Sequence, residues 1–413
     1  MRGVTWVNLM RMKQSEYCRF GDVDDGAFAI GRRYGFKRHH DGRAKKSARS
    51  YRGRIPTVKR ITLLPLLVLT SACGSGNGGL AIAPAANAPT SSPLPAPSSA
   101  TPAAGTLALI GDIGAVHDPA ILKDGATYYL FTTGNAGNEG GLLALRTSTD
   151  LRDWTLRGPS YLSLPAWSKS AVPGATGMWA PDISKVNGQY RLYYSISTFG
   201  TNRSAIGLAT ATKIDPNAPA ANWVDQGPVI RSQTSDNFNA IDPMTFTDAS
   251  GNDWMVFGSY WSGIKLIRLD PITGLRLAGD PAPRALAQRP APDAVEGPYI
   301  IRHGSHYYLF VSFDACCQGV KSSYYTVVGR SSAPDGPYVD RDGKAMLQGG
   351  GTVVLTNGRG DGSRFIGRGG VAVLQQADGD FIVYHAYDTQ RNGIPTLQIP
   401  RLGWTTDGWP VAQ

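Results

Sequence analysis

Three acidic residues stand near the start of similar segments of the chain. Asp118 and Asp242 each come directly before a proline, and Glu296 comes two residues before one. Their neighbours are mostly apolar, and burying a carboxylate in such surroundings is costly unless the group is paired or used. A carboxylate that activates water and a carboxylic acid that protonates the leaving oxygen together hydrolyse a glycosidic bond. A third carboxylate raises the pKa of that acid by like-charge repulsion.

The alternative is that each acid only caps a turn at its proline. This explanation suits a single Asp-Pro pair, and Asp182, which follows its proline, is interpreted as structural. It is weaker for three acids that recur at the head of a repeated segment. The pattern therefore favours glycoside hydrolysis.

The repeated segment consists of a proline or glycine, a short apolar run, a turn containing glycine, and an aromatic run. The five copies begin at Val116, Met178, Ala240, Val295 and Ile366. Their marker residues, spaced by 62, 62, 55 and 71 residues, are Pro119, Pro181, Pro243, Pro298 and Gly369. The aromatic and β-branched runs favour strands. Strong hairpin turn signals stand between the runs at Asp124-Gly125, Asn187-Gly188 and Asp378-Gly379.

A further strand is expected after each hairpin, and no long amphipathic helix is predicted. A unit of about 60 residues cannot bury both faces of its sheet, whereas five units packed around an axis can. The sequence therefore predicts an all-β fold, a five-bladed β-propeller, rather than a sandwich or a parallel β-helix. Because the innermost strands of a propeller surround a central channel, the three acids are expected to converge there.

Four segments of different composition divide the chain. Residues 1–57 are a basic leader of doubtful origin, because Val58 is a possible alternative start. Residues 58–73 have the layout of a secretory signal with a lipobox that ends at Cys73. Residues 74–106 are rich in Ala, Pro and Ser and are expected to form a flexible linker. Residues 107–413 are expected to form the catalytic propeller.

The basic pI of about 9.4 comes from the leader alone. Residues 1–60 contain 16 of the 41 basic and 5 of the 31 acidic residues, which leaves 25 and 26 for the rest of the chain. A nearly neutral exported part argues against nucleic-acid binding and against general binding to acidic membranes. It suits an uncharged substrate such as a plain polysaccharide, and membrane contact is expected only through a lipidated Cys73. A monomer is expected.

The cysteines leave one question open. Cys316 and Cys317 are adjacent in the exported part, whereas Cys18 lies in the leader. An oxidising compartment permits a vicinal disulfide, and two free thiols are the alternative.

Several short motifs together resemble one enzyme family. They are VHDPAI, MWAPDI, AIDPMTF, FGSYWSGIKLIRLDPITG, AVEGPYIIR, YLFVSFDACCQGV and VYHAYD. With these motifs, residues 107–413 resemble the endo-α-1,5-L-arabinanases of glycoside hydrolase family 43. The resemblance implies a five-bladed propeller that inverts the anomeric centre. By motif, Asp118 matches the general base, Asp242 the acid that tunes a pKa and orients the substrate, and Glu296 the general acid.

The resemblance also implies substrate contacts. Trp179 and Phe199 match aromatic residues that pack on sugar rings, and His117 adjoins the base; for each of them a place in the core is the alternative. The adjacent cysteines could form a flat surface beside the cleft.

One segment departs from the family pattern. Many arabinanases carry Gly-Pro-Gly-His in the last blade, where the histidine helps to hold a metal ion or waters on the axis. Here the segment is Gly367-Arg368-Gly369-Gly370, and His385 is the imidazole nearest to it in this blade. The expected ligand for a calcium or other ion on the axis is therefore His385.

The expected activity is endo-acting hydrolysis of α-1,5-L-arabinofuranosyl linkages in arabinan. The first alternative is an exo-acting arabinofuranosidase or β-xylosidase of the same fold. The second, from another class, is a sugar-binding propeller without catalysis, against which the three intact acids argue.

Overall fold

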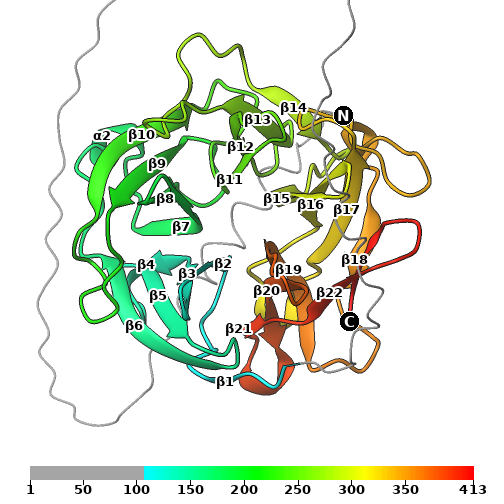
Figure 1. Cartoon of the computed structure of the whole chain (residues 1–413), viewed down its shortest axis with the longest axis horizontal. Coiled ribbons are helices and arrows are strands. Elements are labelled where there is room, and N and C mark those ends of the chain that lie inside the picture. The colour runs from blue at the N-terminus through cyan, green and yellow to red at the C-terminus, as the bar shows by residue number, and fades with distance from the viewer. Residues whose placement is uncertain (1–106) are drawn as a thin grey trace, which may run out of the picture. The chain divides into compact units, whose positions relative to one another are not determined.

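The computed structural model describes residues 107–413, which form five sheets around a central axis (Figure 1). The predicted leader, signal and linker, including Cys73, lie outside the described residues. The sheets are antiparallel except that β1 runs parallel to β6. The expectation of an all-β, five-bladed propeller is confirmed.

The strands of the first three blades follow one another along the chain, except that β4 (Gly134–Asn135) lies between two strands of the first blade and pairs with the second. The first blade contains β1 (Ile110–Gly111), β2 (Ala120–Asp124), β3 (Thr127–Thr132), β5 (Leu142–Ser148) and β6 (Asp153–Tyr161). The second contains β4 (Gly134–Asn135), β7 (Gly177–Val186), β8 (Gln189–Ile196), β9 (Ser204–Ala211) and β10 (Val224–Ser232). The third contains β11 (Met244–Thr247), β12 (Asp253–Phe257), β13 (Ile264–Arg268) and β14 (Arg284–Ala287).

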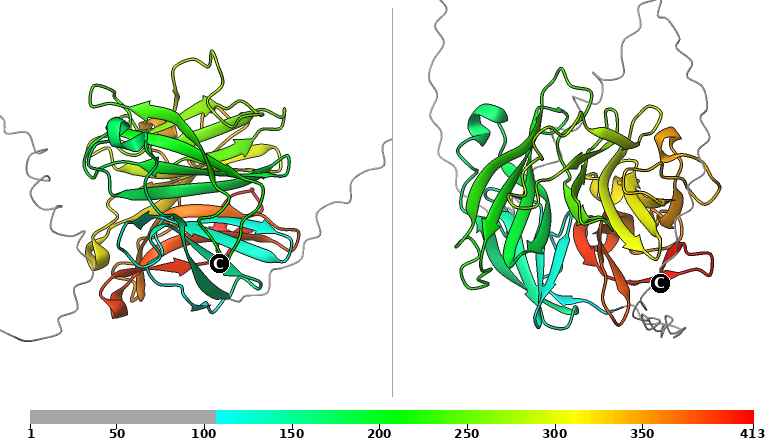
Figure 2. Two further views of the ribbon diagram at one scale, coloured as in Figure 1. Left: turned by 90° about the vertical axis from the view of Figure 1, so that its left-hand side faces the viewer. Right: turned by 45° about the horizontal axis from the view of Figure 1, so that its top comes forward.

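The last two blades complete the ring, and the C-terminus lies at the outer edge of the fifth (Figures 1 and 2). The fourth blade contains β15 (Val295–His303), β16 (His306–Phe313), β17 (Tyr325–Ser331) and β18 (Thr352–Leu355). The fifth contains β19 (Phe365–Leu374), β20 (Asp380–Asp388), β21 (Ile394–Gln398), β22 (Arg401–Trp404) and β23 (Pro410–Ala412).

Helical structure is confined to short turns between strands. The helices in the described residues are α2 (Ser168–Ala171), η1 (Gly319–Lys321), η2 (Met346–Gln348) and η3 (Thr389–Arg391). Within residues 107–413, no helix has the length and apolar character needed to cross a membrane.

Alternating side chains pack each sheet against both of its neighbours. In β16, Tyr307, Leu309 and Val311 are buried against the third blade, while Tyr308 and Phe310 are buried against the fifth. This alternation follows from the two-residue period of a strand. Each of the five interfaces between neighbouring blades has an apolar cluster of this kind. The aromatic runs of the repeat are therefore the packing surfaces of the ring.

The start of the chain closes the ring against the last blade. Val116 donates a backbone hydrogen bond to Pro395 of β21 (3.0 Å), and Leu397 of the same strand donates one to Ile113 (2.9 Å). Leu397 is also fully buried in the cluster between the first and fifth blades. Both ends of the described chain thus contribute to one interface.

The first turn of every inner strand has the same unusual backbone. The residue before each marker position has a positive φ, with values of 47°, 40°, 59°, 58° and 60° at Asp118, Ala180, Asp242, Gly297 and Gly370. The marker of the fifth copy is therefore Val371, and the assignment of Gly369 from the repeat spacing was wrong by two residues. The pairing of β19 with β20 shifts register on both sides of Gly369, whereas β7 and β15 each shift register once against their hairpin partners.

We expect Leu397→Ala to lower the free energy of unfolding by about 2–5 kcal/mol, because it leaves a cavity where the ring closes. Chemical denaturation of the variant and the wild type measures this loss. Val411→Ala is the control, since Val411 lies on the outermost strand and is 43% exposed. An equally small loss in both variants would contradict a stabilising role for the closing interface.

Candidate active site

The pocket on the axis is lined by the first turns of the inner strands of all five blades. Asp118 and Asp242 both line it, together with Ala180, Gly297 and Gly370. A positive φ is unfavourable for residues other than glycine, so the surrounding structure must hold the two aspartates in this conformation. Glu296 directly precedes Gly297 on β15. The three acids predicted from the repeat therefore come together at the axis.

Two neighbouring groups hold Asp118 in its ionised form. Its Oδ2 accepts hydrogen bonds from Thr133 Oγ1 (2.6 Å) and from His117 Nδ1 (2.8 Å). Burial alone would raise the pKa of Asp118, but the charge and hydrogen bond of His117 outweigh burial and hold it well below its usual range. Asp118 is therefore held as a carboxylate, which is the form that a general base requires.

His117 is held on both sides of its ring. Its Nε2 lies 3.0 Å from the hydroxyl of Tyr387, and its ring stacks on that of His385 with centroids 3.7 Å apart. Burial lowers the pKa of His117, but the charges of Asp118 and Cys317 raise it well above the ordinary value. An imidazolium paired with Asp118 explains why the aspartate keeps its charge.

Asp242 has the opposite electrostatic environment. Its backbone N–H donates to Ser195 Oγ (2.9 Å), and its Oδ2 accepts from the backbone N–H of Gly297 (3.1 Å). Burial, followed by the charges of Glu296 and Asp118, raises the pKa of Asp242 well above its ordinary value. Asp242 and Glu296 therefore titrate as a pair that keeps a proton.

Glu296 has the properties required of a general acid. Its Oε2 accepts a hydrogen bond from Ser259 Oγ (2.8 Å). Burial, and then the charges of Cys317 and Asp118, raise its pKa to about 7. One buried cluster thus contains a permanent carboxylate and a carboxylic acid that is protonated up to neutral pH, which are the two forms that glycoside hydrolysis needs.

The predicted aromatic contacts lie at different depths. Trp179 is half-buried in β7, and its Nε1 donates to Asn135 Oδ1 (3.3 Å). Phe199 follows the end of β8 and is 49% exposed. A sugar ring can therefore reach Phe199 from solvent more readily than the half-buried Trp179.

Some members of the cluster were not singled out from the sequence. Tyr387 accepts a hydrogen bond from the backbone N–H of Cys317 (2.6 Å) as well as contacting His117. Thr133 and Ser259 each donate to one of the acids. The available signal was the alternation in β20, which places His385 and Tyr387 on the same face of the strand.

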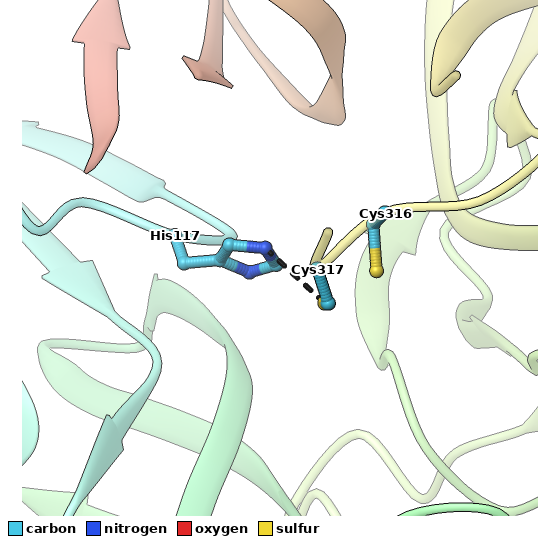
Figure 3. Close-up of side chains that lie close together, drawn as sticks. All are labelled: His117, Cys316 and Cys317. Carbon is cyan, nitrogen blue, oxygen red and sulfur yellow. Dashed lines mark hydrogen bonds between the residues drawn. The ribbon is translucent and has the colours of Figure 1, made fainter. Parts of the chain in front are cut away.

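The two adjacent cysteines also border the cluster (Figure 3). Both cysteines carry free thiols, and Cys317 Sγ lies 3.6 Å from His117 Nε2.

Asp182 links two neighbouring blades. Its Oδ2 accepts hydrogen bonds from the backbone N–H and the hydroxyl of Thr245, and burial raises its pKa to about 6. This structural position agrees with its interpretation from the sequence.

His385 does not fit a directly bound axial ion. Its Nδ1 accepts a hydrogen bond from the backbone N–H of Asp118 (3.2 Å), and burial lowers its pKa well below the ordinary value. The neutral ring therefore carries its proton on Nε2, which has no hydrogen-bond partner among the described residues. An N–H group donates rather than ligates, and calcium prefers oxygen ligands.

Carboxyl groups in opposite protonation states, on the axis of a five-bladed propeller, define a glycoside hydrolase of the propeller class. The sequence profile of glycosyl hydrolases family 43 matches residues 113–410. The chain belongs to this family.

Similar proteins include enzymes of two modes of action. The extracellular endo-α-(1→5)-L-arabinanase 1 of Bacillus subtilis (strain 168) is 44% identical over 297 residues, which cover 71% of this chain and 87% of that relative. The extracellular exo-α-(1→5)-L-arabinofuranosidase ArbA of Cellvibrio japonicus (strain Ueda107) is 37% identical over 308 residues, covering 71% and 85%. The solved family 43 endo-arabinanase of Bacillus licheniformis is 44% identical with a TM-score of 0.66, covering 74% and 99%.

Glu296 is expected to make the stability of the fold depend on pH. Its pKa rises from 4.5 to about 7 on folding, so between these values the folded chain holds a proton that the unfolded chain lacks. The contribution of Glu296 to the free energy of unfolding is therefore present at low pH. It is lost as the pH rises through about 7, by up to about 1.4 kcal/mol per pH unit.

Glu296→Gln removes this titration while keeping the shape of the protonated acid. Urea denaturation at several pH values should show a steeper loss of stability in the wild type than in the variant. If the free energy of unfolding changed with pH in the same way for both proteins, Glu296 would be ionised already at low pH in the folded chain.

Proposed function

We propose that this enzyme hydrolyses α-1,5-L-arabinofuranosyl linkages within arabinan chains by a single displacement with inversion. The observation that carries the proposal is the division of protonation between Asp118, which is held as a carboxylate, and Glu296, whose pKa is raised to about 7. The endo-arabinanase relatives, with identities of up to 44%, support arabinan as the substrate.

Each acid has one part in the reaction. Asp118 takes a proton from a water molecule, and the water oxygen attacks the anomeric carbon of the arabinosyl unit. The bond from this carbon to the leaving oxygen breaks as Glu296 gives its proton to that oxygen. Because water enters from the face opposite the leaving group, the product has the inverted configuration. Activity should therefore decline as the pH rises through about 7 and Glu296 loses its proton.

Asp242 is assigned to tuning and positioning. As an acid that interacts electrostatically with Glu296, it favours retention of a proton by the pair. Its Oδ2 is tied to the backbone N–H of Gly297, the residue after the general acid (3.1 Å). Replacing Asp242 would change both the charge and the position of Glu296.

We assign substrate contacts to His117, Trp179 and Phe199. A furanose ring has an apolar C–H face that an aromatic ring can cover, and the exposed ring of Phe199 is available for this contact. His117 lies beside the base and orients it through the bond from Nδ1 to Asp118.

We further propose that the enzyme is exported and anchored by a lipid on Cys73, with residues 74–106 as the tether. The lipobox-like sequence before Cys73 supports the anchor. Two relatives are named extracellular, which supports export.

Exo action is the second candidate, because one relative at 37% identity is an exo-acting arabinofuranosidase. A product profile on linear arabinan separates the two modes. Endo action is expected to give mixed oligosaccharides from the first minutes and a rapid fall in viscosity. A single small product from the start would identify an exo enzyme instead.

Variants of the two acids should differ in their response to the leaving group. Glu296→Gln is expected to lose about 10²- to 10⁴-fold in rate on arabinan, because general acid catalysis contributes about this much. It should lose far less on an arabino-oligosaccharide with a dinitrophenyl leaving group, which needs no protonation. Asp118→Asn should lose activity on both substrates.

Steady-state rates on the two substrates, with Asp182→Asn as a buried acid outside these roles, give the comparison. Equal losses on both substrates for Glu296→Gln would overturn its assignment as the acid. Unchanged hydrolysis of arabinan by that variant would overturn the proposed chemistry.

A further inference from the structure

Three metal-ligating groups meet at the edge of the acid cluster, and the two thiols among them have no part in the proposed chemistry. His117 Nε2 and the sulfur atoms of Cys316 and Cys317 all lie within 4.8 Å of one another. In Figure 3 the imidazole points toward Cys317, and the two thiol groups lie side by side on the loop that follows β16. This set differs from the one at His385, since it presents two sulfur atoms and a separate imidazole nitrogen.

The spacing of these atoms suits a tetrahedral metal ion. Zinc binds cysteine sulfur at about 2.3 Å and histidine nitrogen at about 2.0–2.1 Å, which places the two ligand atoms about 3.5 Å apart in a tetrahedron. Cys317 Sγ and His117 Nε2 are 3.6 Å apart. The geometry of this pair therefore needs almost no change to accept the ion.

The other nitrogen of His117 already has the partner that a metal-binding histidine usually has. Its Nδ1 lies 2.8 Å from Asp118 Oδ2, and such a carboxylate fixes the ring and strengthens the ligand nitrogen. Tyr387 is the present neighbour of Nε2, at 3.0 Å. Its hydroxyl would give up this contact when an ion binds, and it would keep the hydrogen bond from the backbone N–H of Cys317.

We propose that His117, Cys316 and Cys317 bind a thiophilic divalent cation such as Zn²⁺, with water at the fourth position. Binding releases the proton of each thiol that still carries one, and any proton on Nε2, to solvent. The ion occupies Nε2 of His117, so this nitrogen is no longer available to contact the substrate. Metal binding then inhibits hydrolysis; this consequence, unlike the binding itself, rests on the proposed function.

The test uses the full chain carrying Cys18→Ser and Cys73→Ser, so that only the adjacent pair supplies thiols. The protein is reduced, desalted without oxygen, shown to contain two titratable thiols, and titrated with Co²⁺. One equivalent is expected to give the intense near-ultraviolet absorption of cobalt–thiolate bonds and to be displaced by Zn²⁺. Absence of this absorption in the reduced protein would overturn the proposal.

Variants distinguish a metal site that includes His117 from binding of the ion by the two cysteines alone. Cys316→Ser, Cys317→Ser and His117→Gln should each lose the site, whereas His306→Gln, at the first residue of β16, should keep it. Asp118→Asn should weaken binding by roughly 10- to 100-fold, because it removes the carboxylate behind the ligand. Unchanged cobalt affinity in His117→Gln would show that the imidazole is not a ligand and would overturn the proposal.

The inhibitory consequence is measured as the ratio of rates with and without Zn²⁺. This ratio should fall for the wild type and stay near one for the doubly substituted Cys316→Ser, Cys317→Ser protein, each compared with its own metal-free rate. If no arabinan is hydrolysed in any condition, the proposed function fails while the cobalt titration still decides the metal site.

Discussion

The interface that closes the ring is the constraint on which the site depends. Backbone hydrogen bonds between Val116 and Pro395 and between Leu397 and Ile113 hold the first segment of the described chain against the last blade. The next residues after Val116 are His117 and Asp118, the proposed base, and the fifth blade supplies the rings that contact them. The contacts that close the ring of blades therefore also orient Asp118, the proposed base.

Opposite electrostatic environments within one buried cluster follow from that arrangement. The fifth blade packs His385 and Tyr387 around His117, and the resulting charge lowers the pKa of Asp118. The third and fourth blades place Asp242 and Glu296 in the same buried cluster, where burial and then neighbouring negative charges raise their pKa values. Two carboxyl groups of similar chemistry thus acquire different protonation because different blades surround them.

The blades and the acids were predictable because their signals are local. Strand alternation and turn residues mark each hairpin, and the proline after Asp118 and after Asp242 marks equivalent turns. The fifth copy was misplaced because Val371 stands where the other copies have proline, and because spacing cannot reveal the additional bulge in β19. The partners of the acids were also missed, since the contact from Asp118 to His385 joins residues 267 positions apart and depends on ring closure.

Every inner strand begins with a left-handed turn, so five positions with the same backbone conformation surround the axis. Two of these positions are occupied by aspartate, one by Ala180 and two by glycine. A Cβ atom added at Gly370 would lie 2.9 Å from an oxygen of Asp118 and from the ring of His385. Glycine is therefore required at this position, because its neighbours fill the space that a side chain would need. A common backbone thus lets chemistry diverge between blades by side-chain choice alone, which is how a repeated scaffold acquires an asymmetric centre.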